Sequence, residues 1–307
     1  MRILIVGAGA VGGYFGGRLA QAGRDVTFLV RPVRAKQLSR DGLRIVSPHG
    51  DAVLSPKVVS AEEIDTPYHL VFLSVKAYAL EAAMNDFAAA VGRETMILPV
   101  LNGMRHIDLL AKRFGEHAVT GGVCLVAAEI DDQGRIVQLA DVQRLVYGER
   151  NGESTPRLKT LDATLRGAGF DARLSSDIMQ AMWEKWIQLA SLGAITCLMR
   201  GTIGQIVAAP GGTELSIALL NESAAVASAC GHKPSEDFLS RNAAAMTKTG
   251  SSLTSSMYRD LRKGTPVEAD HILGDLIERG SVHGVATPLL KAALVNLRVY
   301  QDRLPKH

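Results

Sequence analysis

The segment RILIV at residues 2–6 leads directly into GAGAVGG at residues 7–13. RILIV is a continuous apolar run, which is typical of a strand buried on both faces. The glycines of the second segment form a GxGxxG pattern, and the residues from Tyr14 to Gln21 continue as a helix. A strand, a glycine turn and a helix in this order predict a dinucleotide site with the pyrophosphate at the helix N-terminus. The residues expected to bind it are Gly7, Ala8, Gly9, Ala10, Val11 and Gly12. The alternative is a tight turn without a ligand.

Three more apolar runs follow in the first half of the chain: DVTFLV at 25–30, LVFLSV at 70–75 and TMILPV at 95–100. Because helical stretches separate them, they predict a parallel sheet covered on both faces. The stretches TGGVCLVAAEI, GRIVQL and RLVYG predict a later, antiparallel extension of the strands.

After about Asp171 the β pattern stops, and helical periodicity predicts helices over residues 176–200, 212–230, 235–248, 266–280 and 287–303. We therefore expect an α/β fold in which a Rossmann-type doubly wound sheet at residues 1–173 is followed by an all-helical substrate and catalytic domain at residues 174–307.

The composition limits the classes of function. At 307 residues, with 21% charged and 47% hydrophobic residues, the chain is expected to be globular with two domains. A net charge of +3 with scattered Lys and Arg predicts neither a nucleic-acid nor a membrane partner, so we expect a small anionic ligand. Three widely spaced cysteines predict neither a disulfide framework nor a metal site and indicate the cytoplasm. A homodimer is the expectation for the assembly, because closed dimers are the commonest soluble oligomers.

The end of the second strand points to the cofactor. NAD-binding proteins usually carry an acid there, which binds the ribose 2′-hydroxyl. This chain has Val30, Arg31 and Pro32 instead. Arg31, together with Arg34, is suited to bind a 2′-phosphate, so the sequence predicts NADP(H). The alternative is that Arg31 is a solvated loop charge.

Lys76 and Asn102 follow the strands at 70–75 and 95–100. Ligands of doubly wound folds bind at the carboxyl ends of the strands, so both residues are candidates for the site. A solvated strand end for Lys76 and a plain Asn-Gly turn for Asn102 are equally compatible with the pattern.

The chain resembles the ketopantoate reductase (2-dehydropantoate 2-reductase) family. The resemblance is carried, in order along the whole chain, by GAGAVGG, Arg31, SVKAY (74–78), LNGM (101–104), MWEKW (182–186) and SSMYRDLRKGTPVE (255–268). It implies a helical domain like that of 6-phosphogluconate dehydrogenases and NADPH-dependent reduction of ketopantoate to pantoate.

The resemblance also implies roles for single residues. Lys185 is the implied general acid, Asn102 lies between nicotinamide and substrate, and Ser256 binds the substrate. The resemblance places three further residues at the cofactor. Lys76 lies beside it, Glu268 lies near its nicotinamide ribose, and the backbone of Ala128 contacts NADP. The chain departs from the family at three positions where well-known members carry substrate-binding asparagines: Leu189, Gly193 and Ile203. A different, more apolar 2-oxo or 3-hydroxy acid is therefore an alternative substrate. A separate alternative is a protein that senses NADP without turnover.

Local patterns alone favour other roles for some of these residues. Lys185 is compatible with a lysine that extends to solvent along an apolar face. Thr265, Pro266 and Glu268 match a capping box at a helix start. Ser256 is compatible with a helix-start residue, and Glu222 is ambiguous in the same way. Trp183 and Trp186 are expected in the packing of the core.

Overall fold

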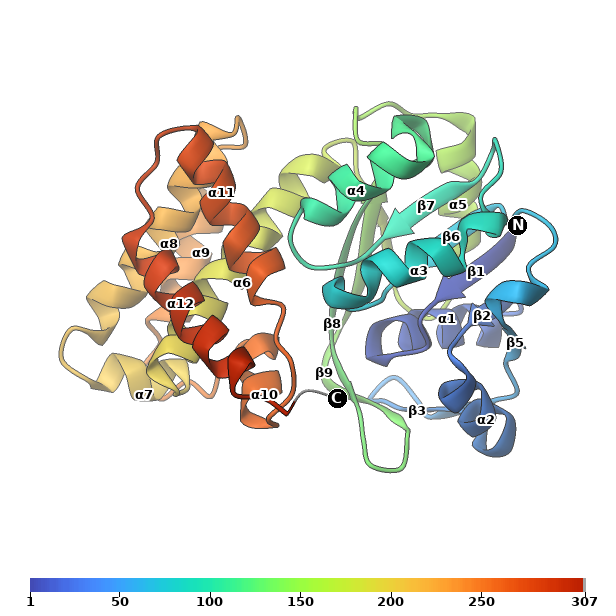
Figure 1. Ribbon diagram of the computed structural model, residues 1–307, viewed down its shortest axis with the longest axis horizontal. Helices are drawn as coiled ribbons and strands as arrows, with labels where there is room; N and C mark the ends of the chain where they lie inside the picture. Colours follow the sequence, from blue (N-terminus) through green and yellow to red (C-terminus); the bar gives the residue numbers. More distant parts are fainter. Residues whose placement is uncertain (306–307) are drawn as a thin grey trace. The chain divides into compact units, whose positions relative to one another are not determined.

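The computed structural model describes residues 1–305. A five-stranded parallel sheet lies in its first half, with the strand order β5–β2–β1–β6–β7 (Figure 1). The strands are β1 (Arg2–Val6), β2 (Asp25–Leu29), β5 (Lys57–Val59), β6 (Leu70–Leu73) and β7 (Met96–Pro99). All residues of β6 and β7 are buried, as expected for strands with both faces covered. The four predicted strands are confirmed to within two residues at each end, and β5 is additional.

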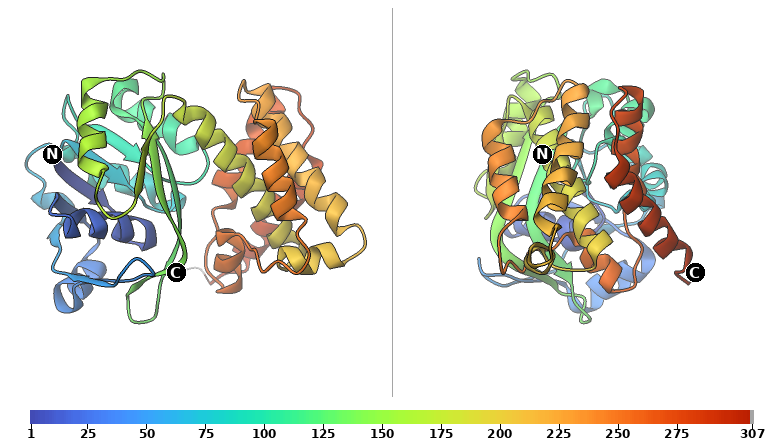
Figure 2. Two further views of the ribbon diagram at one scale, coloured as in Figure 1. Left: turned by 180° about the vertical axis from the view of Figure 1, so that it is seen from behind. Right: turned by 90° about the vertical axis from the view of Figure 1, so that its left-hand side faces the viewer.

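The chain changes direction between β1 and β6. From β1 it proceeds through α1 (Ala10–Gln21) to β2 on one side, and from β6 through α3 (Leu80–Asp86) to β7 on the other. Right-handed crossovers then place α1 and α3 on opposite faces of the sheet. Figure 1 shows α3 and α4 (Arg105–Phe114) together on one face, and Figure 2 shows β8 and β9 on the other side. The carboxyl ends of β1 and β6 form the topological switch point, where such folds bind ligands.

A second sheet has the order β10–β9–β3–β4, with β8 also paired to β9. Its strands are β3 (Leu43–Val46), β4 (Ala52–Leu54), β8 (Gly121–Ile130), β9 (Ile136–Gly148) and β10 (Asp171–Leu174). The antiparallel β8–β9 pair confirms the predicted extension. The expectation that strands end at about Asp171 is wrong, because β10 pairs in parallel with β9. Its sequence DARL is largely exposed and therefore lacks an apolar run.

Helix α1 packs between the two sheets, and glycines on two of its faces allow this. A Cβ atom on Gly16 would lie 2.8 Å from Ile5 and Phe28 of the parallel sheet. A Cβ atom on Gly13 would collide with Ile136 of β9. Side chains at these two positions would push the sheets away from α1, so the glycines permit one hydrophobic core that includes both sheets.

The chain divides into two compact units. One contains Met1–Leu101 and His106–Met179, and the other contains Asn102–Arg105 and the chain from Gln180 onward. The remaining helices of the first unit are α2 (Pro32–Asp41) and α5 (Pro156–Leu165). The predicted division after residue 173 stays a prediction.

The second unit is helical, and α8 packs against α7, α9, α11 and α12. Its elements are α6 (Ile178–Met199), α7 (Ile203–Ala208), α8 (Gly212–Ala229), α9 (Glu236–Met246), α10 (Ser256–Arg262), a π-helix (Asp270–Gly274) that continues into α11 (Asp275–Val282), and α12 (Pro288–Asp302). Helix α6 is buried almost all around from Trp186 to Cys197, as its apolar sequence requires. No helix of residues 1–305 is long and apolar enough to span a membrane.

Four of the five predicted helices are confirmed, and the fifth is wrong at its start. Residues 265–268 lie outside any helix, although a helix was predicted from 266. The amide of Val267 donates to the side-chain oxygen of Gln301, which holds this segment against α12. Glu222 has a structural role, because its carboxylate accepts hydrogen bonds from the amides of Leu289 and Leu290 at 3.0 Å. It thereby caps the start of α12.

Candidate functional site

The glycine turn lies at the switch point of the parallel sheet. Gly7 follows β1 with φ +95°, a conformation that favours glycine. Gly9 precedes α1, and no side chain caps this helix start. The first-turn amides of α1 therefore lack intrahelical partners and carry the positive end of the helix dipole. A Cβ atom on Gly9 would meet no atom within 4 Å, so the space beside the turn is open to a ligand.

Ser74, which follows β6, forms hydrogen bonds to the start of this turn. Its hydroxyl lies 3.1 Å from the carbonyl oxygen of Val6 and 3.0 Å from that of Gly7. A Cβ atom on Gly12 would overlap the same hydroxyl and the Gly7 carbonyl. Gly12 therefore permits the close approach of helix to strands that a dinucleotide turn requires. This arrangement fits a pyrophosphate held by backbone amides.

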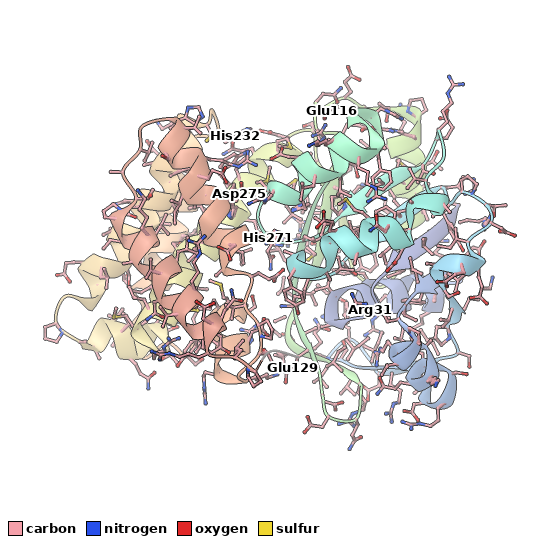
Figure 3. The ribbon with its side chains drawn as sticks, in the orientation of Figure 1. Arg31, Glu116, Glu129, His232, His271 and Asp275 are labelled. Carbon is pink, nitrogen blue, oxygen red and sulfur yellow. The ribbon has the colours of Figure 1, made fainter. Side chains whose placement is uncertain are left out.

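Two arginines lie at the start of α2. Arg31 is the exposed residue that precedes the helix (Figure 3). Arg34 is half-buried, and its Nε donates to the carbonyl oxygen of Ala8 in the glycine turn at 3.1 Å. Its Nη1 donates to Gln37 at 2.6 Å and to the Gly134 carbonyl at 3.2 Å. The Nη2 atom is buried without a hydrogen-bond partner, and burial lowers the pKa of Arg34. A charged donor thus lies directly beside the turn.

Lys76 and Ala128 occupy different surroundings in the same unit. Lys76 is exposed and follows β6 by three residues. Ala128 lies in β8 opposite Gln138, next to a bulge in the β8–β9 pairing. The structure thus places Lys76 at the switch-point edge of the parallel sheet, and Ala128 on the second sheet.

In the helical unit, Lys185 is half-buried on α6, and the residues beside it are fixed by hydrogen bonds. The carboxylate of Glu184 accepts hydrogen bonds from the amide and the hydroxyl of Ser235, both at 3.1 Å. The indole of Trp186 donates to the carbonyl oxygen of Ile272 at 2.8 Å. Lys185 is therefore carried by a rigid segment. Trp183 and Trp186 are buried, which confirms the expectation that they are core residues.

The segment Asn102–Arg105 belongs to the helical unit. Gly103 has φ +81°, and a Cβ atom on it would lie 2.6 Å from the carbonyl oxygen of His271 and 3.8 Å from the Trp186 indole nitrogen. The segment thus lies against the π-helix, an element that is frequent at functional sites. The segment also lies close to Trp186 of α6, the helix that carries Lys185.

His271 is the histidine of this π-helix (Figure 3). Burial lowers its pKa, against the opposing effect of the nearby Glu268 carboxylate. Sequence reasoning missed both His271 and the π-helix, because neither leaves a distinct pattern in the sequence.

Ser256 begins α10, and Glu268 follows this helix in the chain. The N-cap of α10 is Ser255, whose hydroxyl accepts from the Tyr258 amide at 2.9 Å. Ser256 is the first residue of the helix and is half-buried. Glu268 is buried and precedes the π-helix. The capping box at Thr265 is wrong, because the Thr265 hydroxyl donates to the Asp260 carbonyl at 3.0 Å instead.

The three positions that depart from the family pattern are apolar in structure as well as in sequence. Ile203 is fully buried at the start of α7. Leu189 is half-buried on α6. Gly193 lies against Met257 of α10, a contact that sequence reasoning missed because the two residues are far apart in the chain.

Comparison with known proteins identifies the family. Residues 3–152 match the family described as "Ketopantoate reductase PanE/ApbA", and residues 177–301 match its C-terminal domain. The chain belongs to the ketopantoate reductase family. This confirms the resemblance and the predicted fold class. It makes the chain a member of an oxidoreductase family.

Individual members of the family are similar over nearly the whole chain. The uncharacterized oxidoreductase YkpB of Bacillus subtilis is 35% identical, and the alignment covers 98% of this chain and 99% of YkpB. A 2-dehydropantoate 2-reductase of Mesorhizobium japonicum is 28% identical, with 97% of each chain covered. The crystal structure of 2-dehydropantoate 2-reductase from Geobacter metallireducens superimposes with a TM-score of 0.89 at 28% identity, covering 97% of this chain and 99% of that one.

Proposed function

We propose that this protein reduces a 2-oxo acid to the corresponding 2-hydroxy acid with NADPH, and that ketopantoate, reduced to pantoate, is its substrate. The observation that carries the proposal is the presence of an open glycine turn and a half-buried α6 lysine in one chain whose two halves match the ketopantoate reductase family. Each unit supplies one of the two elements that the reaction needs.

The residues of the first unit fit a dinucleotide. The backbone of Gly7 to Gly12 would hold the pyrophosphate, because the amides at the start of α1 are available and no side chain obstructs Gly9. Arg31 and Arg34 would bind the 2′-phosphate of NADPH by charge-assisted hydrogen bonds. The resemblance adds Lys76, Ala128 and Glu268 as further contacts of the cofactor. When bound, NADPH supplies the hydride that reaches the carbonyl carbon.

Lys185 would donate the proton that completes the reduction. As the carbonyl carbon gains hydride, the C=O π bond breaks and charge develops on the oxygen. An ammonium next to that oxygen stabilises the charge and then transfers its proton, which yields the hydroxyl group. The resulting neutral amine is reprotonated from solvent. Asn102 and Ser256 would orient the 2-oxo acid by hydrogen bonds.

A second candidate substrate is a more apolar 2-oxo or 3-hydroxy acid. The observation that favours it is the contact of Gly193 with Met257, together with Leu189 one turn closer to Lys185. A hydroxyl group on the substrate side chain would meet no polar partner from these three residues. An unpaired buried hydroxyl costs about 1–3 kcal/mol, which would weaken the binding of ketopantoate.

Steady-state kinetics with a panel of 2-oxo acids, each with NADPH and with NADH, test the proposal. We expect consumption of NADPH with at least one 2-oxo acid, a higher kcat/KM with NADPH than with NADH, and ketopantoate among the best substrates. A preference for a 2-oxo acid without a hydroxyl group would favour the second candidate. Tight NADPH binding without oxidation by any member of the panel would overturn the proposal in favour of a sensing protein. We also propose that the protein is a homodimer and lies in the cytoplasm. The molar mass measured by light scattering tests the homodimer.

A further inference from the structure

Lys185, Leu189 and Gly193 lie in one row of α6. They are spaced by four residues, so they follow one another along the same face of the helix. The row therefore begins with an ammonium group, continues with an apolar side chain and ends with a position that has no side chain. Any ligand that extends from Lys185 toward the C-terminal end of α6 passes along this row.

The start of α10 crosses α6 at the end of this row. The hydroxyl oxygens of Thr196 on α6 and Ser255, the residue before α10, lie 2.8 Å apart. The Thr196 hydroxyl donates to the Leu192 carbonyl at 2.6 Å, so it accepts the hydrogen bond from Ser255. The residues on either side of Ser256 are therefore both held against α6, because Ser255 bonds to Thr196 and the Met257 methyl group faces Gly193.

Met257 occupies the space above Gly193. A Cβ atom on Gly193 would lie 2.6 Å from the terminal methyl carbon of Met257, the one atom within 4 Å of it apart from its chain neighbours and the nearby backbone of α6. Met257 is 3% exposed, so its side chain is enclosed rather than extended into solvent. Because methionine is unbranched and has three rotatable bonds, it is the side chain best suited to fill such a gap.

We propose that Met257, lying over Gly193, is the specificity-determining residue of this protein and limits the length of the 2-oxo acid side chain that it accepts. The inference rests on the proposed function and deepens it. The carbonyl of the substrate lies at Lys185, its side chain runs along Leu189, and the Met257 methyl group forms the end wall. The length of side chain that the site accepts is set by the space between Leu189 and this methyl group.

The test is the ratio of kcat/KM for 2-oxohexanoate to that for 2-oxobutanoate, measured with NADPH. These two acids differ by two methylene groups at the end of the side chain. One methylene in an apolar pocket changes kcat/KM by about tenfold or more. Met257→Ala is expected to raise the ratio by about tenfold or more, mainly through a lower KM for 2-oxohexanoate. Met199→Ala is the matched control, because Met199 is 44% exposed at the end of α6, the helix that carries Gly193.

Three further variants distinguish a steric effect of the Met257 methyl group on the substrate from a general effect on folding. Met257→Leu shortens the side chain with little loss of volume and is expected to raise the ratio less than Met257→Ala does. Gly193→Ala places a methyl group against Met257 and is expected to lower the ratio. The double variant Gly193→Ala/Met257→Ala removes the steric clash between the new methyl group and the Met257 side chain. Its ratio is expected to be higher than that of Gly193→Ala alone.

The outcomes distinguish this inference from the proposed function. Turnover by the wild-type chain, with a ratio that stays within about twofold in folded Met257→Ala or does not rise at all in folded Met257→Leu, would overturn the inference and leave the proposed function standing. An equal rise in Met199→Ala would also overturn it. Absence of turnover by the wild-type chain with every 2-oxo acid would overturn the proposed function and the inference with it.

Discussion

The indole nitrogen of Trp186 donates a hydrogen bond to the carbonyl oxygen of Ile272 at 2.8 Å. This bond joins α6, one residue after Lys185, to the π-helix against which the Asn102 segment packs. Both residues are buried, so the bond between them is shielded from water. The bond therefore fixes the backbone on which two of the candidate site residues depend.

Trp186→Phe is expected to destabilise the protein by about 0.5–1.5 kcal/mol, because the buried hydrogen bond to the Ile272 carbonyl is lost. It is also expected to lower kcat, since the lysine and the Asn102 segment lose their common anchor. Urea unfolding and steady-state kinetics measure the two effects. Trp183→Phe is the matched control, because Trp183 stacks on His232 and shares the aromatic cluster. A kcat for Trp186→Phe no lower than that of Trp183→Phe would contradict the anchoring role.

Gly103→Ala is expected to cost more stability than the same change at Gly264. Both glycines have positive φ, +81° and +69°, so alanine is strained at either position by about 1–2 kcal/mol. Only at Gly103 does the new methyl group also meet a backbone atom, the His271 carbonyl oxygen. The difference in unfolding free energy between the two variants isolates that contact. Equal losses would show that the Asn102 segment does not depend on its approach to the π-helix.

Arg31→Ala is expected to raise the KM for NADPH by about tenfold or more while leaving the KM for NADH nearly unchanged, because only NADPH carries the 2′-phosphate. Arg34→Ala is expected also to lower stability, since this side chain bonds to Ala8, Gln37 and Gly134. Arg40→Ala, an exposed change on the same helix, serves as the control. The same rise in KM for both cofactors would speak against a phosphate contact at Arg31.

His271 makes the stability of the protein depend on pH. Burial lowers its pKa below the ordinary value of 6.5, so the unfolded chain binds a proton more readily than the folded one. Its contribution to stability is complete above pH 6.5 and is lost as the pH falls toward the lowered pKa. His271→Asn is expected to flatten the fall of unfolding free energy across this range, whereas the exposed His283→Asn is not. A curve for His271→Asn that is parallel to wild type would refute the assignment.

The fold was predictable where a run of apolar residues in the sequence corresponds to a strand that is buried in the structure. RILIV, LVFLSV and TMILPV are continuous apolar runs because β1, β6 and β7 are covered on both faces. The short strands β4 and β5 gave no such signal, since Val53 is 72% exposed and most of β5 faces solvent. A strand that is three residues long and partly exposed differs little from a loop in its composition.

The candidate site was predictable only as a set of residue types. The turn at Gly7 to Gly12 and the motif around Lys185 are local patterns, so they were visible in the sequence. The contact of Met257 with Gly193, the bond from Trp186 to Ile272 and the approach of Gly103 to His271 join segments that are distant in the chain. No local pattern encodes such pairs. The same holds for Glu222, whose partners lie 67 and 68 residues away.

We propose that Lys185 donates the proton in the reduction, and the kcat of Lys185→Ala with NADPH and the best 2-oxo acid of the panel tests this role. Removal of a general acid is expected to lower kcat by about 10²–10⁴-fold, while NADPH still quenches or shifts protein fluorescence on binding. Lys185→Arg retains the charge but not a readily transferred proton, so its kcat is expected to stay low. A Lys185→Ala enzyme that folds, binds NADPH and turns over within about tenfold of wild type would show that Lys185 is not the proton donor.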